Sequence, residues 1–379
     1  KMNRSARPSV TRINELQQQI ALLANLRPAA GAVVSCYLDL GQEKSMLQSF
    51  VRNRLGAELA RVPAAQRGAF EACIDVIEAQ LESDLPRRAR GLAIFAAADG
   101  KAPLLSAMPF AVPFRRSLTV SRSPDLLPLV QLKELYGRFL IVMAEPQGLQ
   151  LAEVNLGDVS VKVWATSSAH PVTDPAGGHS PLQAPRAGGL FSQVSLIERH
   201  LGKAGSCPVF LAGDVDVMQA IPELLGSSSV ARLMGALPMP ADATLHETAA
   251  ECLRTLVDFE TSQARSTAAQ VLRQIRNQGH AVAGTAAVLD AIRKGIADRL
   301  VISSDYRPEP RQRYSMDQND DLSLRVELIR LAAQQRFPVE FADSEALHYL
   351  GGVGCLLRDE PQALAQPTPP RYGSLDLVA

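Results

Sequence analysis

The stretch Leu350-Gly-Gly-Val-Gly-Cys-Leu-Leu-Arg-Asp359 of this 379-residue chain combines closely spaced glycines with an apolar run. Glycine adopts backbone angles that other residues avoid, so Gly351 and Gly352 predict a tight turn. The run 353–357 has the composition of a buried strand. We therefore expect a turn that leads into a core strand lying close against a layer of helices.

Helices and strands alternate in the sequence before this stretch. From about 243 to 278 there is no proline and apolar residues recur at helical spacing, which predicts one long helix or two with a break. The segment Gly284-Thr-Ala-Ala-Val-Leu-Asp-Ala-Ile-Arg-Lys-Gly295 predicts a helix with a left-handed C-terminal glycine. The other predicted elements are strand 299–303, a polar mobile excursion 304–321, helix 322–335 and strands 338–341 and 353–357. This order predicts an α-β-α sandwich.

The middle of the chain predicts a different sheet. Three strands, 138–143, 149–154 and 159–164, are joined by short turns, which requires antiparallel neighbours. After a long irregular loop the pattern gives helix 191–201, strand 208–212 and helix 218–225. A meander followed by such units is typical of a ribonuclease H-like sheet. The Ser- and Pro-rich stretch 226–240 is interpreted as a connection between domains.

The first segment predicts an α/β domain. Strand Ala32-Val-Val-Ser-Cys-Tyr-Leu-Asp39 is followed by helical patterns at 47–59 and 66–81. Three further strands are predicted at 91–96, 103–108 and 117–120. The fold class is therefore α/β in three domains: an N-terminal α/β domain (1–134), a ribonuclease H-like middle domain (135–240) and an α-β-α C-terminal domain (241–360). A disordered tail is expected at 361–379.

The composition, 46% hydrophobic and 21% charged residues, is that of a globular protein. No apolar run is long enough to span a membrane and no signal-peptide core is present, so we expect a cytoplasmic protein without a membrane partner. The five cysteines are widely spaced and the histidines lack ligand spacing, which predicts buried free thiols, no metal and no cofactor.

The net charge is zero, but the first 134 residues are basic. The arginines that create this excess are predicted to contact RNA phosphates, and a solvated surface is the alternative. The candidate RNA-binding residues are Arg87, Arg88, Arg90, Arg115 and Arg116, with Arg122 nearby in the sequence.

Four fragments in order resemble the C-terminal domain of the archaeal and eukaryotic class-one peptide-chain release factors and Pelota. They are the helix 284–295, the strand 299–303, the helix segment Val326-Glu-Leu-Ile-Arg-Leu-Ala-Ala333 and the closing Leu350-Gly-Gly-Val-Gly-Cys-Leu-Leu-Arg358. Towards the N-terminus, Ser35-Cys-Tyr-Leu-Asp-Leu40 and Gly91-Leu-Ala-Ile-Phe95 resemble the bacterial branch of this family. The resemblance implies a Pelota-type C-terminal domain and a translation protein that acts on the ribosome and tRNA, in ribosome rescue or in peptidyl-tRNA hydrolysis. It also allows a translational GTPase as a partner, and it implies neither DNA nor membrane binding.

Release factors of this family carry Gly-Gly-Gln in a loop of the middle domain, where glycines permit close approach and an amide can orient water or stabilise an oxyanion. This chain has no Gly-Gly-Gln. The first candidate is Gly188, Gly189 and Gln193, which directly precedes a helix. It resembles a bacterial variant that reads Gly-Gly-x-Ser-Gln before an Arg-His helix, and it departs from that variant by one extra residue. The second candidate is Gly177, Gly178 and Gln183, and a flexible surface loop is the alternative to both.

The missing motif leaves open whether the protein is an enzyme. A non-catalytic adaptor that binds RNA or protein on the same scaffold is one rival, and the absence of a sequence like Asn-Ile-Lys-Ser argues against codon-specific termination. A nuclease is another, with Asp214 and Asp216 as magnesium ligands, although Asp216 is more simply a helix N-cap. Neither Ser180 nor Ser192 lies in the G-x-S-x-G pattern of a nucleophile elbow.

Overall fold

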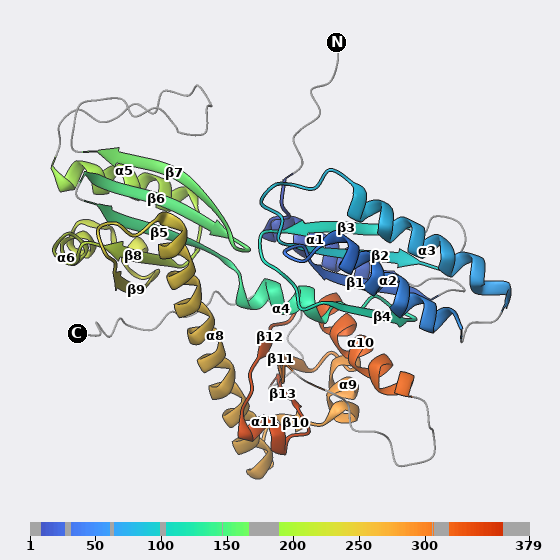
Figure 1. Ribbon diagram of the computed structural model, residues 1–379. Helices are drawn as coiled ribbons and strands as arrows, with labels where there is room; N and C mark the ends of the chain where they lie inside the picture. Colours follow the sequence, from blue (N-terminus) through green and yellow to red (C-terminus); the bar gives the residue numbers. More distant parts are fainter. Residues whose placement is uncertain are drawn as a thin grey trace. The chain divides into compact units, whose positions relative to one another are not determined.

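The computed structural model describes residues 9–26, 32–60, 64–98, 104–145, 147–166, 189–304, 306 and 318–358. Within these residues the chain forms three β-sheets, each covered by helices (Figure 1). It divides into two compact units. Among the described residues, the composite unit joins those up to Tyr136 with those from Asp258 to Arg358, and the middle unit is Gly137–Val257. The chain is thus a mixed α/β protein, as its sequence predicts.

The first sheet contains the four strands predicted in the N-terminal segment. They are β1 (Val33–Asp39), β2 (Gly91–Ala97), β3 (Leu104–Phe110) and β4 (Ser117–Ser121), in the order β3-β2-β1-β4 with all neighbours antiparallel. Helices α2 (Lys44–Leu59) and α3 (Ala64–Glu82) pack on one face, where Cys36 and Leu38 of β1 join their core. Since side chains alternate along a strand, Ser35 and Tyr37 face the opposite side.

Two further helices belong to this segment, α1 (Ile13–Asn25) and α4 (Leu127–Leu135). The sequence did not predict α4, which has only nine residues and a proline in its first turn. Proline is tolerated there because the first amides of a helix have no partner within it. The chain entering α4 is fixed to β1: the hydroxyl of Tyr37 donates to the carbonyl of Asp125 at 2.6 Å, and the amide of Asp125 donates to Ser35 Oγ at 2.9 Å.

The second sheet, in the middle unit, confirms the predicted meander. Its strands are β5 (Arg138–Glu145), β6 (Gly148–Asn155), β7 (Asp158–Thr166), β8 (Val209–Gly213) and β9 (Leu233–Pro238), in the order β7-β6-β5-β8-β9. The first three are antiparallel, whereas β8 runs parallel to β5 and β9 parallel to β8. Helices α5 (Leu190–Lys203) and α6 (Val215–Leu224) share a core with one face of the sheet. The first part of α8 (Leu245–Arg276) packs through Ala249, Cys252 and Leu256 on the other.

The interpretation of 226–240 as a connection is wrong. This stretch forms the short helix α7 (Ser227–Val230) and the edge strand β9. Only Leu233 of β9 is fully buried, and the strand contains Gly235 and Pro238, so it lacks the apolar signal of a core strand. Its place comes from backbone pairing with β8. The predicted domain boundaries stay a prediction, since α8 contributes to the cores of both units.

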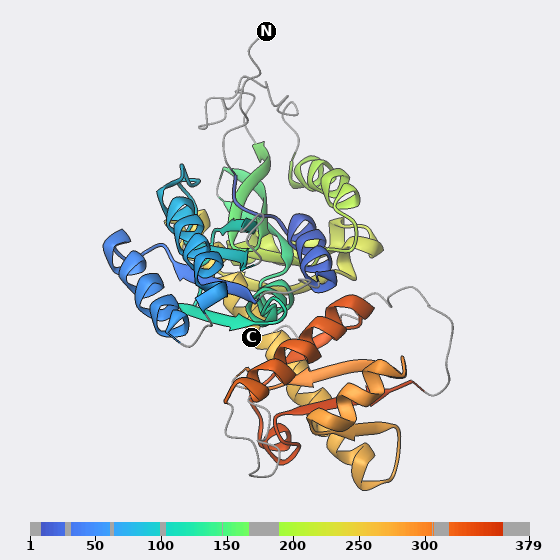
Figure 2. The ribbon, with the colours of Figure 1, turned by 90° about the vertical axis from the view of Figure 1, so that its right-hand side faces the viewer.

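The third sheet lies in the composite unit and includes every strand predicted for the C-terminal segment (Figure 2, orange and red). Its strands are β10 (Ala281–Ala283), β11 (Ala297–Ile302), β12 (Val339–Phe341) and β13 (Val353–Leu357), in the order β10-β13-β11-β12. Val301 of β11 packs with Ala264, Ala268 and Val271 of α8, so the long helix covers one face. The remaining helices are α9 (Thr285–Arg293), α10 (Gln318–Gln335) and the short α11 (Glu345–Tyr349). The sequence did not predict β10 or α11. Most of the predicted excursion 304–321 and all of the predicted tail 361–379 lie outside the described residues.

The closing glycines behave as the sequence predicts. Gly351 and Gly352 have φ of 71° and 78° and form the turn before β13. A Cβ at Gly354 would lie 2.9 Å from Cγ1 of Val271, so the strand can approach α8 only with glycine at this position. All three glycines serve the packing of the sheet against its helix layer, and none of them brings a reactive group with it.

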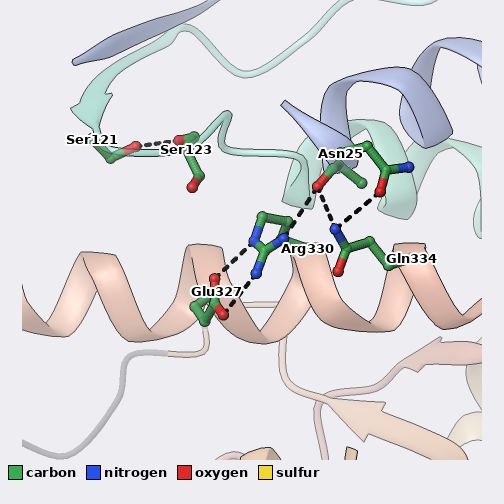
Figure 3. A network of polar contacts seen from close by, with 7 residues as sticks. Asn25, Ser121, Ser123, Glu327, Arg330 and Gln334 are labelled. Atoms are coloured by element: carbon green, nitrogen blue, oxygen red, sulfur yellow. Dashed lines mark hydrogen bonds and ion pairs between the residues drawn. The ribbon is translucent and has the colours of Figure 1, made fainter. Parts of the chain in front are cut away.

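Helix α10 is bound to the N-terminal part of the composite unit through Arg330 (Figure 3). This side chain is 4% exposed, pairs with Glu327 at 2.8 Å and donates from Nη1 to the carbonyl oxygen of Ala24 at 3.3 Å. Gln334 donates to the same carbonyl at 2.9 Å and to Oδ1 of Asn25 at 3.2 Å. The last carbonyls of a helix lack partners within it, so α10 completes the C-terminal end of α1.

A second arginine of α10 makes a similar contact. Nη2 of Arg325 lies 2.8 Å from Oδ2 of Asp125, whose side chain is 4% exposed. Asp125 is the residue whose backbone binds Ser35 and Tyr37 of β1. The contact therefore connects α10 with β1, an inner strand of the first sheet, through a single residue.

We expect Arg330→Ala to lower the free energy of unfolding by about 2 kcal/mol, because it removes a buried ion pair and leaves Ala24 with one donor fewer. Urea unfolding followed by circular dichroism measures the change. The exposed Arg293→Ala on α9 is the matched control and should change stability by less than about 0.5 kcal/mol. Equal losses in the two variants would contradict this role for Arg330.

Three carboxylates from different elements meet around Glu260 of α8. Burial, and then the negative charges of Glu134 on α4 and Glu340 on β12, raise the pKa of Glu260 to about 7. Glu134 pairs with Lys133 at 2.6 Å and Glu340 pairs with Arg299 at 2.7 Å. The folded protein thus holds a proton at Glu260 that the unfolded chain releases at lower pH.

This raised pKa predicts the sign of a pH effect. Above the unfolded pKa the folded state must either retain the proton or bury a charge, so stability falls as pH rises towards 7. Glu260→Gln should increase the free energy of unfolding by about 1–2 kcal/mol at pH 8, after allowance for partial exposure, and by much less at pH 5. Urea titrations at both pH values test this, with the exposed Asp258→Asn on the same helix as control. A gain that does not depend on pH would refute the assignment.

Candidate functional site

The predicted release loop lies between β7 and α5. Gly188, and the whole alternative set of Gly177, Gly178 and Gln183, fall outside the described residues. Gly189 is the exposed N-cap of α5, and a Cβ built on it would meet nothing within 4 Å. A side chain is therefore sterically admissible at Gly189, although the sequence interpretation gave this glycine a role in close approach.

Gln193 is not on the loop but in the second turn of α5, and only 6% of it is exposed. It shares the buried face of this amphipathic helix with Val194 and Ile197. In this arrangement its amide cannot reach a large substrate unless the first turns of α5 unwind. Its catalytic role stays a prediction. The exposed side chain next to the glycines is instead Phe191, which is 68% exposed and was not singled out from the sequence.

The predicted RNA-binding arginines meet at one end of the first sheet. β1 ends at Asp39, which pairs with Gly91 at the start of β2, and Gly91 also pairs with Phe110 at the end of β3. β4 begins at Ser117 beside Tyr37, at the same end. The loops that leave this end carry all five candidates, each exposed: Arg87, Arg88, Arg90, Arg115 and Arg116. The two groups of arginines are more than 20 residues apart in the sequence, so the sequence did not show that they converge. The antiparallel register of the strands brings their loops to the same end of the sheet.

Two of these arginines occupy defined positions. The amide of Arg90 donates to Phe110 at 2.7 Å and its carbonyl accepts from Leu40 at 2.8 Å, which extends the ladder by one residue. Nη1 of Arg116 donates to Gln42 Oε1 at 3.1 Å, and its guanidinium carbon lies 4.6 Å from the ring centroid of Phe50. Arg122, in contrast, follows the opposite end of β4 and does not belong to this group.

A groove of about 400 Å³ runs along α2 beside Arg116. Its lining combines hydroxyl, amide, guanidinium and apolar groups and contains no carboxylate. The lining residues are Ser45, Met46, Ser49, Phe50, Asn53, Arg54 and Arg116. The groove and the converging arginines make this end of the first sheet the candidate site for contact with a nucleic acid.

The candidate magnesium pair is explained by helix capping. The side chain of Asp214 accepts from the amide of Val217 at 3.1 Å, so Asp214, and not Asp216, is the N-cap of α6. Both residues line a hollow of about 350 Å³ with Pro238 and Pro240. Across the described ranges, no group of three or more His, Cys, Asp or Glu side chains is arranged to hold a metal ion.

The five cysteines are free, and four are buried. Burial raises the pKa of Cys36 and Cys252 to about 12 and that of Cys355 to about 11. Thiols with such pKa values are not nucleophiles at neutral pH. Among the helices the structure describes, none is long and apolar enough to cross a membrane.

Several solved structures match the chain at low similarity. The archaeal translation termination factor aRF1 is 15% identical, over 92% of this chain and 99% of that chain, with a TM-score of 0.28. Archaeal Pelota, from a model of its ribosome-bound form with ABCE1, is 13% identical over 90% and 94%, with a TM-score of 0.41. Dom34 of S. cerevisiae, described as a translation termination-like factor that interacts with Hbs1, is 12% identical over 71% and 80%, with a TM-score of 0.40.

No protein-family model and no curated protein matches the sequence. The identities and TM-scores of the solved structures are low, so this likeness assigns neither a family nor an activity to the chain.

Proposed function

We propose that this protein is a release-factor-like translation protein that acts on ribosomes, in ribosome rescue or in peptidyl-tRNA hydrolysis. The observation that carries the proposal is the assembly of the four family-like fragments into one layered structure. Those fragments form α9, β11, the second half of α10 and the turn with β13. β11 and β13 are paired, and Gln335 of α10 donates to the carbonyl of Ile292 on α9 at 2.6 Å. Fragments far apart in sequence thus occupy one domain in contact with one another.

The middle unit supports the proposal independently. A three-strand antiparallel meander followed by parallel β8 and β9 is the strand plan of a ribonuclease H-like domain. The stretch of sequence with two Gly-Gly pairs ends at Gly189, the N-cap of α5. In the proposed function the first domain contacts RNA through its converging arginines, the middle domain presents this loop towards tRNA, and a translational GTPase is a candidate partner of the third.

The adaptor is the second candidate, and one observation favours it. Gln193, the glutamine of the preferred loop, is buried on α5 and not displayed with the glycines. A protein with this arrangement can bind a stalled ribosome without promoting hydrolysis. The two candidates share ribosome binding and differ in peptide release.

Incubation with stalled ribosome–nascent-chain complexes separates them. For release at this loop, we expect the protein to co-sediment with the complexes and free the peptide. Gly189→Ala should then reduce the release rate by about tenfold or more without loss of binding, because its Cβ would keep the backbone from approaching the tRNA ester closely enough for contacts worth a few kcal/mol. The side chain of Ala has space at Gly189, so a loss of release would not reflect misfolding. Gln193→Ala is tested with a thermal unfolding control because the residue is buried.

Co-sedimentation without release by the unaltered protein would support the adaptor. Failure to bind ribosomes would reject both candidates.

A further inference from the structure

The exposed face of α2 presents two parallel rows of side chains. Ser45, Ser49 and Asn53 form a polar row at intervals of four residues. Met46, Phe50 and Arg54 form a second row, one residue further along. Residues four apart lie on the same helix face, so the rows run side by side, and both line the groove beside Arg116. The core of the helix is a separate stripe formed by Leu47, Val51 and Leu55.

The charge around the groove is positive and unopposed within its lining. Arg116 and Arg54 line it, and the other strand-end arginines extend from the same end of the first sheet. Arg52 points elsewhere, because its guanidinium is paired with Glu78 of α3. The carboxylate of Asp39 accepts from the amide of Gly41 at 2.9 Å, and the exposed Glu43 precedes the helix without lining the groove. Such a surface suits an anionic partner.

The groove also offers flat and apolar contacts. Phe50 packs against the core of the first sheet and carries the guanidinium of Arg116 over its ring at 4.6 Å. Gln42 holds Arg116 at 3.1 Å, which fixes the position of the guanidinium. Met46 beside them is 54% exposed. A base stacks on aromatic rings and on guanidinium planes, so this arrangement is suited to an unpaired base together with its phosphates.

We propose that the α2 groove is a subsite for one or two nucleotides of single-stranded RNA, bound without sequence preference. Arg116 and Arg54 pair with phosphates, Ser45, Ser49 and Asn53 bond to sugar and phosphate oxygens, and a base stacks at Phe50, Arg116 and Met46. The strand-end arginines bind the flanking phosphates. An unpaired strand fits better than a duplex, because stacking requires a base that is free of its own stack. The inference rests on the proposed function for its biological setting, but binding of free RNA can be measured without ribosomes.

Fluorescence anisotropy of the full chain with a labelled oligouridine of about 12 nucleotides tests the subsite. We expect Arg116→Gln to weaken binding about tenfold and to reduce the salt-dependence slope by about 0.7 per lost phosphate contact. Phe50→Leu should weaken binding several-fold, about 1 kcal/mol of stacking, while leaving the slope unchanged. Arg122→Gln, at the opposite end of β4, is the matched control and should leave the affinity within about twofold. Circular dichroism confirms folding of the Phe50 variant.

The outcomes separate this inference from the proposed function. If Arg116→Gln and Phe50→Leu bind oligouridine like the unaltered chain, or if an oligoglutamate peptide binds the groove and RNA does not, the subsite is rejected. Loss of ribosome co-sedimentation with intact, Arg116-dependent binding of oligouridine would reject the proposed function and retain the subsite.

Discussion

The composite unit depends on the ion pairs formed by two arginines of α10, Arg325 and Arg330, whose side chains lie in its interior. Arg325 and Arg330 are largely removed from water, and a buried guanidinium is tolerated only when carboxylates or carbonyls surround it. Arg325 forms an ion pair with Asp125. Arg330 forms an ion pair with Glu327 and donates to the carbonyl of Ala24 at the end of α1. Asp125 is itself bound to β1, so the same residue fixes this inner strand of the first sheet and the helix that arrives some 200 residues later.

That pairing leaves free the surface of the first domain that we propose for RNA contact. α2 and α3 cover one face, and the polar contacts to α10 come from the other face, through Asp125. The ends of the sheet are not covered by these contacts, and the antiparallel register brings the loops that carry the arginines to one end. The inner side of α2 packs on the sheet through Leu47, Val51 and Leu55, which leaves the outer rows for a ligand. The proposed RNA contact and the glycine-containing loop therefore belong to different units, each with its own core.

Much of the fold could be predicted because periodicity and turn residues report local structure. The strands of the meander, the long α8 and the turn at Gly351 and Gly352 follow their sequence patterns closely. The errors occur where an element owes its place to a neighbour. β9 pairs with β8 although most of its side chains are partly exposed, and α4 begins with a proline and has nine residues. The N-cap of α6 is Asp214 and not Asp216, because the side chain of Asp214 accepts a hydrogen bond from the amide of Val217 in the first turn.

The sequence by itself determined most of the helices and strands, the basic character of the first 134 residues and the candidate loop at Gly189, because these depend on local composition. Only the tertiary structure decided which of the candidate side chains meet and which are hidden. It gathers the arginines at one end of a sheet through strand register, and it places Gln193 in the core of the middle unit because α5 turns that face towards the sheet. The meeting of these arginines and the burial of Gln193 depend on contacts between segments that are distant in the sequence, so local composition alone did not show them.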